Sequence, residues 1–126
     1  MPAMAEINIF KHAPDSIAVE SGDVLFREGD SGDVMFAVVT GEVDLVRDGR
    51  VVETVGPGGI LGELALIDPA PRSAEARART SASVVRVDQR QFTFLVHEHP
   101  TFALQVMRVM AERLRKTNED VSSLEH

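Results

Sequence analysis

The sequence predicts a mainly β fold with added helices: an antiparallel, jelly-roll-like β-roll followed by a short helix and one long C-terminal helix. Short apolar runs between glycine and aspartate turns fill residues 16–88, as in β-sandwiches and barrels. Asp48 and Gly49 lie between two valine-rich runs, which is a strong hairpin signal. From Gln89 onward the apolar residues take a helical spacing. Together these patterns predict strands first and helices last.

The expected strands are short, because glycine, aspartate and proline interrupt every apolar run. The run after the turn at residues 28–33 is continuously apolar, and 56–59 (Gly-Pro-Gly-Gly) ends the hairpin. The predicted strands are 17–19, 24–26, 34–39, 43–46, 51–55 and 83–87.

Two helices are expected after the last strand. Residues 91–96 suggest a short one, and Pro100 suits the first position of a long one. The long helix should reach about Ser122, a length of roughly 35 Å at the usual rise per residue.

Size and composition limit the class of protein. The chain has 126 residues, 44% hydrophobic and 26% charged, which suits one soluble packed domain. A formal net charge of −7 argues against a binder of nucleic acid, which normally carries a basic face. The absence of cysteine excludes disulfides and thiolate metal sites.

The sequence also bears on location and domain limits. It holds no apolar run near the ~20 residues that cross a bilayer, and its first ten residues do not resemble a signal peptide. We therefore expect a cytoplasmic protein without membrane contact. We expect one domain over residues 1–123, because 124–126 (Leu-Glu-His) is typical of the start of a purification tag.

The segment with most chemical content is 58–74, GGILGELALIDPAPRSA. A very short helix after Gly62 would present amide groups that lack internal partners, which favours an anion. Arg72 offers a planar fork of donors for phosphate and Ser73 a hydroxyl, while Glu63 can accept from a sugar hydroxyl. Each residue also has a plainer interpretation: Arg72 as a surface side chain, Glu63 as a favourable charge at a helix start. Their concentration in one segment favours an anion site.

This segment resembles the phosphate-binding cassette of the cyclic-nucleotide-binding family, which includes catabolite activator proteins and protein kinase A regulatory subunits. The resemblance lies in Gly-Glu-Leu-Ala at 62–65 and Pro-Arg-Ser-Ala at 71–74, and extends to 28–36 and 41–43. It implies a β-roll that binds a cyclic purine nucleotide, cAMP before cGMP, as its ligand and needs no cofactor. Leu61 departs from the aromatic residue that many members have there.

The resemblance also implies roles for single residues. Arg72 would pair with the cyclic phosphate, with Ser73 and the amides of Leu64 and Ala65 as further donors. Glu63 would accept from the ribose 2′-hydroxyl, and Gly62 would permit the close approach.

The long helix resembles the dimer helix of catabolite activators at 114–121. Thr117 and Asn118 fall where that family places a threonine and a serine against the base, so asparagine is a departure that leaves base selectivity open. Catabolite activators continue into a DNA-binding domain, whereas this chain stops, so we expect no DNA binding.

The predicted function is a stand-alone regulatory domain that reports a cyclic nucleotide through its C-terminal helix to an unknown downstream protein. One alternative is an interaction scaffold of the same fold with little nucleotide binding. A second is a small enzyme acting on a phosphorylated ligand, which the lack of a nucleophile–base pair disfavours. The turn aspartates and the histidines at 97 and 99 lack the spacing of a metal site.

A heptad stripe on the long helix predicts a homodimer. The alternative is that the stripe packs on its own β-roll. The stripe consists of Ala103, Met107, Met110, Leu114, Thr117 and Val121.

Overall fold

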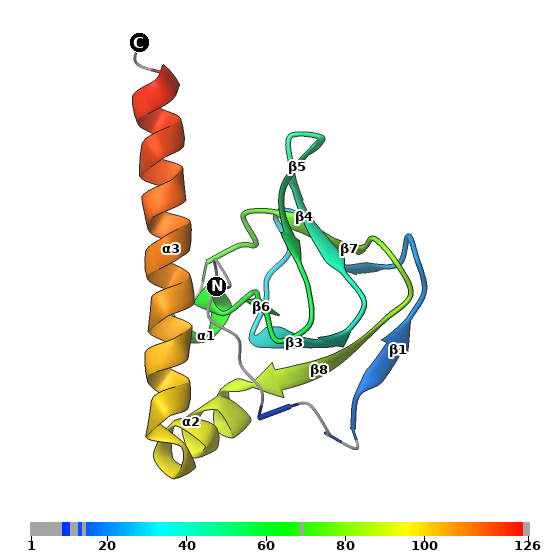
Figure 1. Cartoon of the computed structure of the whole chain (residues 1–126), viewed down its shortest axis with the longest axis vertical. Coiled ribbons are helices and arrows are strands. Elements are labelled where there is room, and N and C mark those ends of the chain that lie inside the picture. The colour runs from blue at the N-terminus through cyan, green and yellow to red at the C-terminus, as the bar shows by residue number, and fades with distance from the viewer. Residues whose placement is uncertain (1–8, 11–12, 14, 69, 125–126) are drawn as a thin grey trace.

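Two four-stranded antiparallel sheets face each other and form the predicted β-roll (Figure 1). The structure is a computed structural model, and it describes residues 9–10, 13, 15–68 and 70–124, with the side chains of 118–124 excepted. One sheet has the order β1 (Ile17–Val19), β8 (Ala82–Asp88), β3 (Val34–Thr40), β6 (Ile60–Leu61). The other has the order β2 (Val24–Phe26), β7 (Glu75–Ala78), β4 (Val43–Arg47), β5 (Arg50–Val55).

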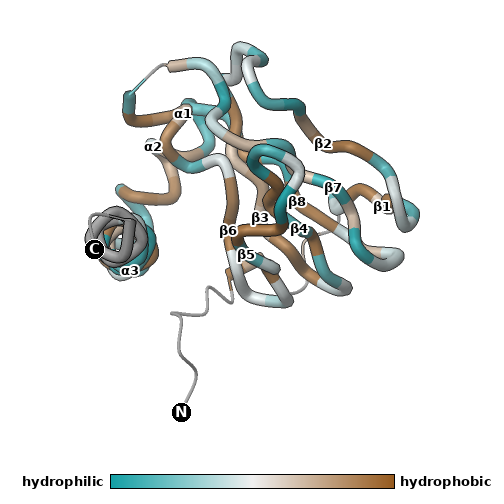
Figure 2. Tube along the Cα trace, turned by 90° about the horizontal axis from the view of Figure 1, so that it is seen from above, coloured by the Kyte–Doolittle hydropathy of each residue, from teal (hydrophilic) through white to brown (hydrophobic). Residues whose placement is uncertain are grey.

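Strand β3 is buried on both faces, which explains its continuous apolar run. Because side chains alternate along a strand, its residues divide between two cores. Val34, Phe36 and Val38 point between the two sheets, whereas Met35 and Ala37 point toward the helices. Figure 2 shows hydrophobic stretches of β3, β4 and β6 brought together in the roll.

The hairpin of β4 and β5 turns at the predicted pair. Asp48 and Gly49 have φ angles of 53° and 75°, so both adopt the left-handed conformation that a type I′ turn requires. This is the position at which the Asp-Gly signal acts, since few other residue pairs accept two positive φ angles.

Three helices lie on one side of the roll (Figures 1 and 2). The first, α1 (Leu64–Ile67), is a single turn inside the cassette segment. The second, α2 (Gln89–Glu98), begins two residues earlier than predicted, because Asp88 and Gln91 form a capping box at its start, and it ends two residues later than predicted. The third, α3 (Pro100–Leu124), begins at the predicted proline and ends at the first residue of the expected tag remnant. Glu125 and His126 lie outside the described residues.

Helix α3 packs on the roll through one apolar face. Phe102, Val106 and Val109 are fully buried in the core that Met35 and Ile60 also join. Phe102 makes edge contacts with the rings of Phe10 and Phe92. The seating face therefore lies at the N-terminal half of the helix, and the C-terminal turns extend past the roll (Figure 1).

Met110 of the predicted heptad stripe packs against the core of the roll, but most of the stripe lies outside the face that is buried there. Met107 and Leu114 are 55% and 63% exposed, Ala103 and Met110 are half-buried, and Val121 lies outside the described side chains. Leu104 and Ala111 are exposed as well. At 100° per residue, the exposed row lies on nearly the opposite side of α3 from its buried face. The row consists of Leu104, Met107, Ala111 and Leu114.

No helix in the described part of the chain is both long enough and apolar enough to cross a membrane.

Strands β6 and β7 are additions that the sequence did not predict as separate elements.

Candidate functional site

A cavity of about 560 Å³ lies between the cassette segment, the β4–β5 hairpin and α3. The chain segments that wall it are far apart in the sequence: 62–74 from the cassette, 45–53 from the hairpin and 110–117 from α3. Its lining holds four cationic side chains and three carboxylates, a formal surplus of one positive charge. Such a surplus suits a ligand with one negative charge. The charged lining residues are Arg47, Arg72, Arg113, Lys116, Glu53, Glu63 and Asp68.

Arg72 is the buried cation of this cavity, with 8% of its surface exposed. The turn at 28–30 fixes its backbone: Arg72 N–H donates to Asp30 O, and Gly29 N–H donates to Arg72 O, both at 2.8 Å. Its side chain donates to Val34 O at 2.7 Å and to Gly62 O at 3.1 Å. The guanidinium carbon lies 4.2 Å from the centre of the Phe26 ring.

The Arg72 guanidinium still has unused donor capacity. Its Nε is buried and has no hydrogen-bond partner among the described residues. Burial holds the pKa of this guanidinium below its ordinary value, although the negative charges of Asp33, Glu63 and Asp30 oppose that shift. A buried cation with an unsatisfied donor is stabilised by an anion in the same cavity.

Two glycines make room for this guanidinium. A Cβ atom on Gly32 would lie 2.2 Å from Arg72 Nε, and one on Gly62 would lie 2.6 Å from Arg72 Nη1. Gly62 also has a φ of +74°, which side chains rarely adopt. Gly62 was predicted as a site residue, whereas Gly32 was not, because nothing in its turn sequence indicates a contact with residue 72.

Glu63 is the buried carboxylate of the site, with 4% of its surface exposed. Its Oε1 accepts from Nη1 of Arg113 on α3. The same guanidinium donates from Nε and Nη2 to the two oxygens of Glu53 on β5, at 2.9 and 3.0 Å, and from Nη2 to Ile60 O. Burial alone lowers the pKa of Arg113, but the hydrogen bonds and charges of Glu53 and Glu63 outweigh it and raise that pKa.

The structure brings most of the predicted site residues to this one cavity. Gly62, Glu63, Leu64, Ala65, Arg72, Ser73 and Thr117 all line it, and the side chain of Asn118 lies outside the described side chains. Ser73 is exposed, and its carbonyl accepts from Arg47 Nε at 3.0 Å. Thr117 is exposed, and its hydroxyl donates to Arg113 O at 3.0 Å.

One detail of the expected anion site is wrong. Both early amides of the short helix were expected to lack internal partners, but Ala65 N–H donates to Gly62 O at 3.3 Å. The helix has only one turn, so its backbone closes on Gly62, two residues before its first residue. That bond is long for an N–H···O contact, and a stronger acceptor could replace it.

Sequence reasoning missed Arg113 and Glu53, although weak signals existed for both. Arg113 lies four residues before Thr117, which places the two on the same face of a helix. Glu53 lies two residues before the buried Val55, so the two share one face of β5. A single charged residue on the same face of a strand as a buried valine indicates a buried ion pair.

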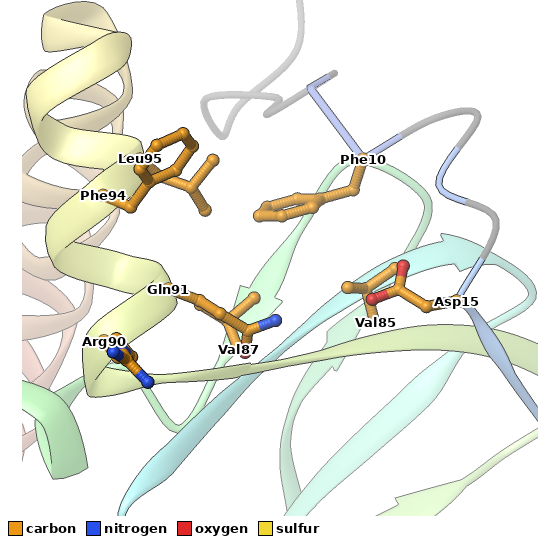
Figure 3. Close-up of a pocket in the computed structure, with 8 residues that line it drawn as sticks. All are labelled: Phe10, Asp15, Val85, Val87, Arg90, Gln91, Phe94 and Leu95. Atoms are coloured by element: carbon orange, nitrogen blue, oxygen red, sulfur yellow. The ribbon is translucent and has the colours of Figure 1, made fainter.

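A second cavity, of about 400 Å³, lies beneath α2 and is mostly apolar. Figure 3 shows Phe10 reaching toward Leu95, with Val85 and Val87 below them and Arg90 and Asp15 at opposite ends. None of the predicted site residues lines it. Within the described residues, no group of three or more histidine, cysteine, aspartate or glutamate side chains could hold a metal.

Comparisons with known proteins agree with this geometry. The family model described as "Cyclic nucleotide-binding domain" matches residues 16–99. A CRP-like cAMP-activated global transcriptional regulator of Mycobacterium tuberculosis is 33% identical over 108 residues, which are 82% of this chain and 48% of that protein. The chain thus spans about half the length of the curated relatives it matches first.

Solved structures share the fold. The catabolite activator protein of Thermus thermophilus superposes with a TM-score of 0.79 at 28% identity, covering 88% of this chain and 55% of that one. The cAMP-bound fragment PfPKA-R (141–441) superposes with a TM-score of 0.71 at 27% identity, covering 86% of this chain and 37% of that one. These matches confirm the predicted fold class and family resemblance.

Proposed function

Because the chain belongs to the cyclic nucleotide-binding domain family, we propose that it binds a cyclic purine nucleotide, cAMP before cGMP, and signals through α3. One observation carries the proposal: Arg72 is buried at the wall of a cavity, and its Nε has no partner among the described residues. The phosphodiester of a cyclic nucleotide has a single negative charge, which matches the surplus positive charge of the cavity lining.

The cavity residues divide the ligand between them. Arg72 and the Ser73 hydroxyl hold the cyclic phosphate, with the amides of Leu64 and Ala65 as further donors. Glu63 accepts from the ribose 2′-hydroxyl through the oxygen that Arg113 does not occupy. We assign recognition of the base to Thr117 and Asn118 on α3.

Signalling through α3 follows from the shared use of Glu63. The carboxylate that receives the sugar is the one that anchors α3 through Arg113. Lys116 adds a second tie by donating to Val52 O at 2.7 Å. A ligand that changes the Glu63–Arg113 pair changes how α3 is held, so binding and helix position are thermodynamically linked.

The proposal includes the setting in which the domain works. We place it in the cytoplasm as a single domain over residues 1–123, without catalytic activity, membrane contact or DNA contact of its own, and with a downstream protein as its receiver. The alternative of an interaction scaffold with little nucleotide binding draws support from the exposed row Leu104, Met107, Ala111 and Leu114 on α3.

A thermal shift series tests the proposal. A ligand at 100 times its Kd adds about 2.7 kcal/mol to the free energy of unfolding, so binding raises Tm measurably. We expect shifts with cAMP and smaller ones with cGMP, and none with 5′-AMP. No shift with any nucleotide would favour the scaffold, and an equal shift with 5′-AMP would favour a site for phosphomonoesters.

A further inference from the structure

Arg113 is held by two carboxylates, and only one of them belongs to the cassette. Four of its five N–H groups are engaged: two by Glu53, one by Glu63 and one by Ile60 O. Glu53 receives the paired fork of Nε and Nη2, whereas Glu63 receives a single bond from Nη1. The arrangement leaves Glu63 Oε2 without a bond from Arg113.

The geometry of a guanidinium explains why this division needs a second carboxylate. Arginine and a carboxylate prefer two parallel hydrogen bonds, because the fork of donors matches the two oxygens. Without Glu53, the fork of Arg113 is free to turn onto Glu63 and take both of its oxygens. The sugar hydroxyl would then compete with a buried cation for the same acceptor.

We propose that Glu53 is a positioning residue for sugar recognition, which holds the fork of Arg113 on β5 and so keeps one oxygen of Glu63 free for the 2′-hydroxyl. The proposal rests on the proposed function. The sites of contact are well buried, with side-chain exposures of 14% for Glu53, 19% for Arg113 and 5% for Glu63. In such an environment the ion pairs are little screened by solvent. Loss of the Glu53 charge should therefore change the hydrogen bonds between Arg113 and Glu63.

The test compares the affinities of cAMP and 2′-deoxy-cAMP by calorimetry. Wild type should prefer cAMP by about tenfold or more, as expected for a hydrogen bond to a charged acceptor. In Glu53→Gln the preference should fall to about threefold or less, because cAMP loses affinity while the deoxy ligand, which does not use Glu63, keeps most of its own. Glu42→Gln removes the same charge at an exposed residue outside the cavity and should keep the wild-type preference.

A second variant tests the route through Arg113 without altering Glu53. Arg113→Lys keeps the charge but has no fork that could take both oxygens of Glu63, so the sugar preference should stay close to that of wild type. In the Arg113→Lys background, Glu53→Gln should therefore leave the preference unchanged, whereas it lowers the preference when Arg113 is present. A merely structural role for Glu53 would lower both affinities equally and leave their ratio unchanged.

The outcomes separate this inference from the function on which it rests. If wild type binds cAMP with a clear 2′-hydroxyl preference and a folded Glu53→Gln retains it, the positioning role is overturned and the proposed function stands. A loss of the preference when Glu53→Gln is added to Arg113→Lys overturns it equally, because no fork is then present to be released. If wild type does not bind cAMP, the proposed function falls and this inference falls with it.

Discussion

Arg72 is the residue whose loss should weaken ligand binding most, because it is the buried cation with an unused donor. Truncating one partner of a buried charge pair typically costs ~2–5 kcal/mol. Arg72→Ala should therefore lower the affinity for cAMP by about thirtyfold or more, with the fold retained. Calorimetry measures the affinity and circular dichroism the fold. Arg86→Ala, an exposed arginine on β8 outside the cavity, is the matched control and should bind as wild type does.

Gly32 should affect the position of the Arg72 guanidinium only because it has no side chain and so leaves room for it. Its φ is not in the left-handed region, so an alanine is acceptable to the backbone, but the added Cβ would lie 2.2 Å from Arg72 Nε. Gly32→Ala should displace the guanidinium and weaken cAMP binding by about tenfold, with a loss of about 1–3 kcal/mol in stability. Gly56→Ala adds a Cβ with no atom within 4 Å and should change neither. Equal affinities of the two variants would contradict this account.

Arg72 and Gly32 show which properties of single residues can be predicted from the sequence and which cannot. The chemistry of Arg72, Ser73 and Glu63 could be predicted, because donors and acceptors are properties of residue types and the four-residue motifs keep them together. The steric role of Gly32 could not, because it depends on a contact between segments 40 residues apart in the chain. The Glu53–Arg113 pair depends likewise on a contact between β5 and α3.

At the scale of elements, Phe102 should be the residue that seats α3. It is fully buried and touches two other rings from the N-terminal segment and α2. Phe102→Ala should lower the free energy of unfolding by about 3–5 kcal/mol, as is usual for deleting a buried ring. Phe94→Ala, at a ring that is 61% exposed, should change it by about 0.5 kcal/mol or less. Urea denaturation of both variants measures the difference, and similar midpoints would show that α3 is seated by other contacts.

Helices and strands with a strong sequence pattern could be predicted, whereas those with a weak pattern were missed. Strand β3, the hairpin turn and the start of α3 follow from a continuous apolar run, an Asp-Gly pair and a proline. Strand β7 was missed because Glu-Ala-Arg-Ala has low intrinsic strand preference, and β6 because two residues are too few for a period. Both strands form because partners on β2, β4 and β3 offer hydrogen bonds there, which is tertiary information.

At the scale of the whole molecule, the charge balance opposes association with DNA. The net charge is −7, and attraction to a phosphate backbone requires a basic face. The 126-residue chain should therefore show no specific binding to DNA at physiological salt, with or without cAMP. An electrophoretic mobility shift assay across a salt series measures this, and a retarded band that survives 150 mM salt would contradict the expectation.

The exposed side of α3 should join two copies of the chain. Its row of Leu104, Met107, Ala111 and Leu114 follows the spacing of three and four that suits pairing with a second helix, and it lies away from the face that packs on the roll. Ala111 and Leu114 of this row also line the cavity, as does Thr117 one turn further, so a ligand there and a helix partner would act on the same stretch of α3. We expect a homodimer whose stability changes with cAMP, because two equilibria that share residues must influence each other.

Light scattering with and without cAMP should show a dimer for wild type and for Thr101→Glu, an exposed control at the start of α3. Met107→Glu places a charge inside the apolar row at a residue that does not line the cavity, and it should shift the chain to monomer at the same concentration. A wild type that stays monomeric at high concentration in both conditions would rule out the dimer, and α3 would then act as a lid over the cavity of its own chain.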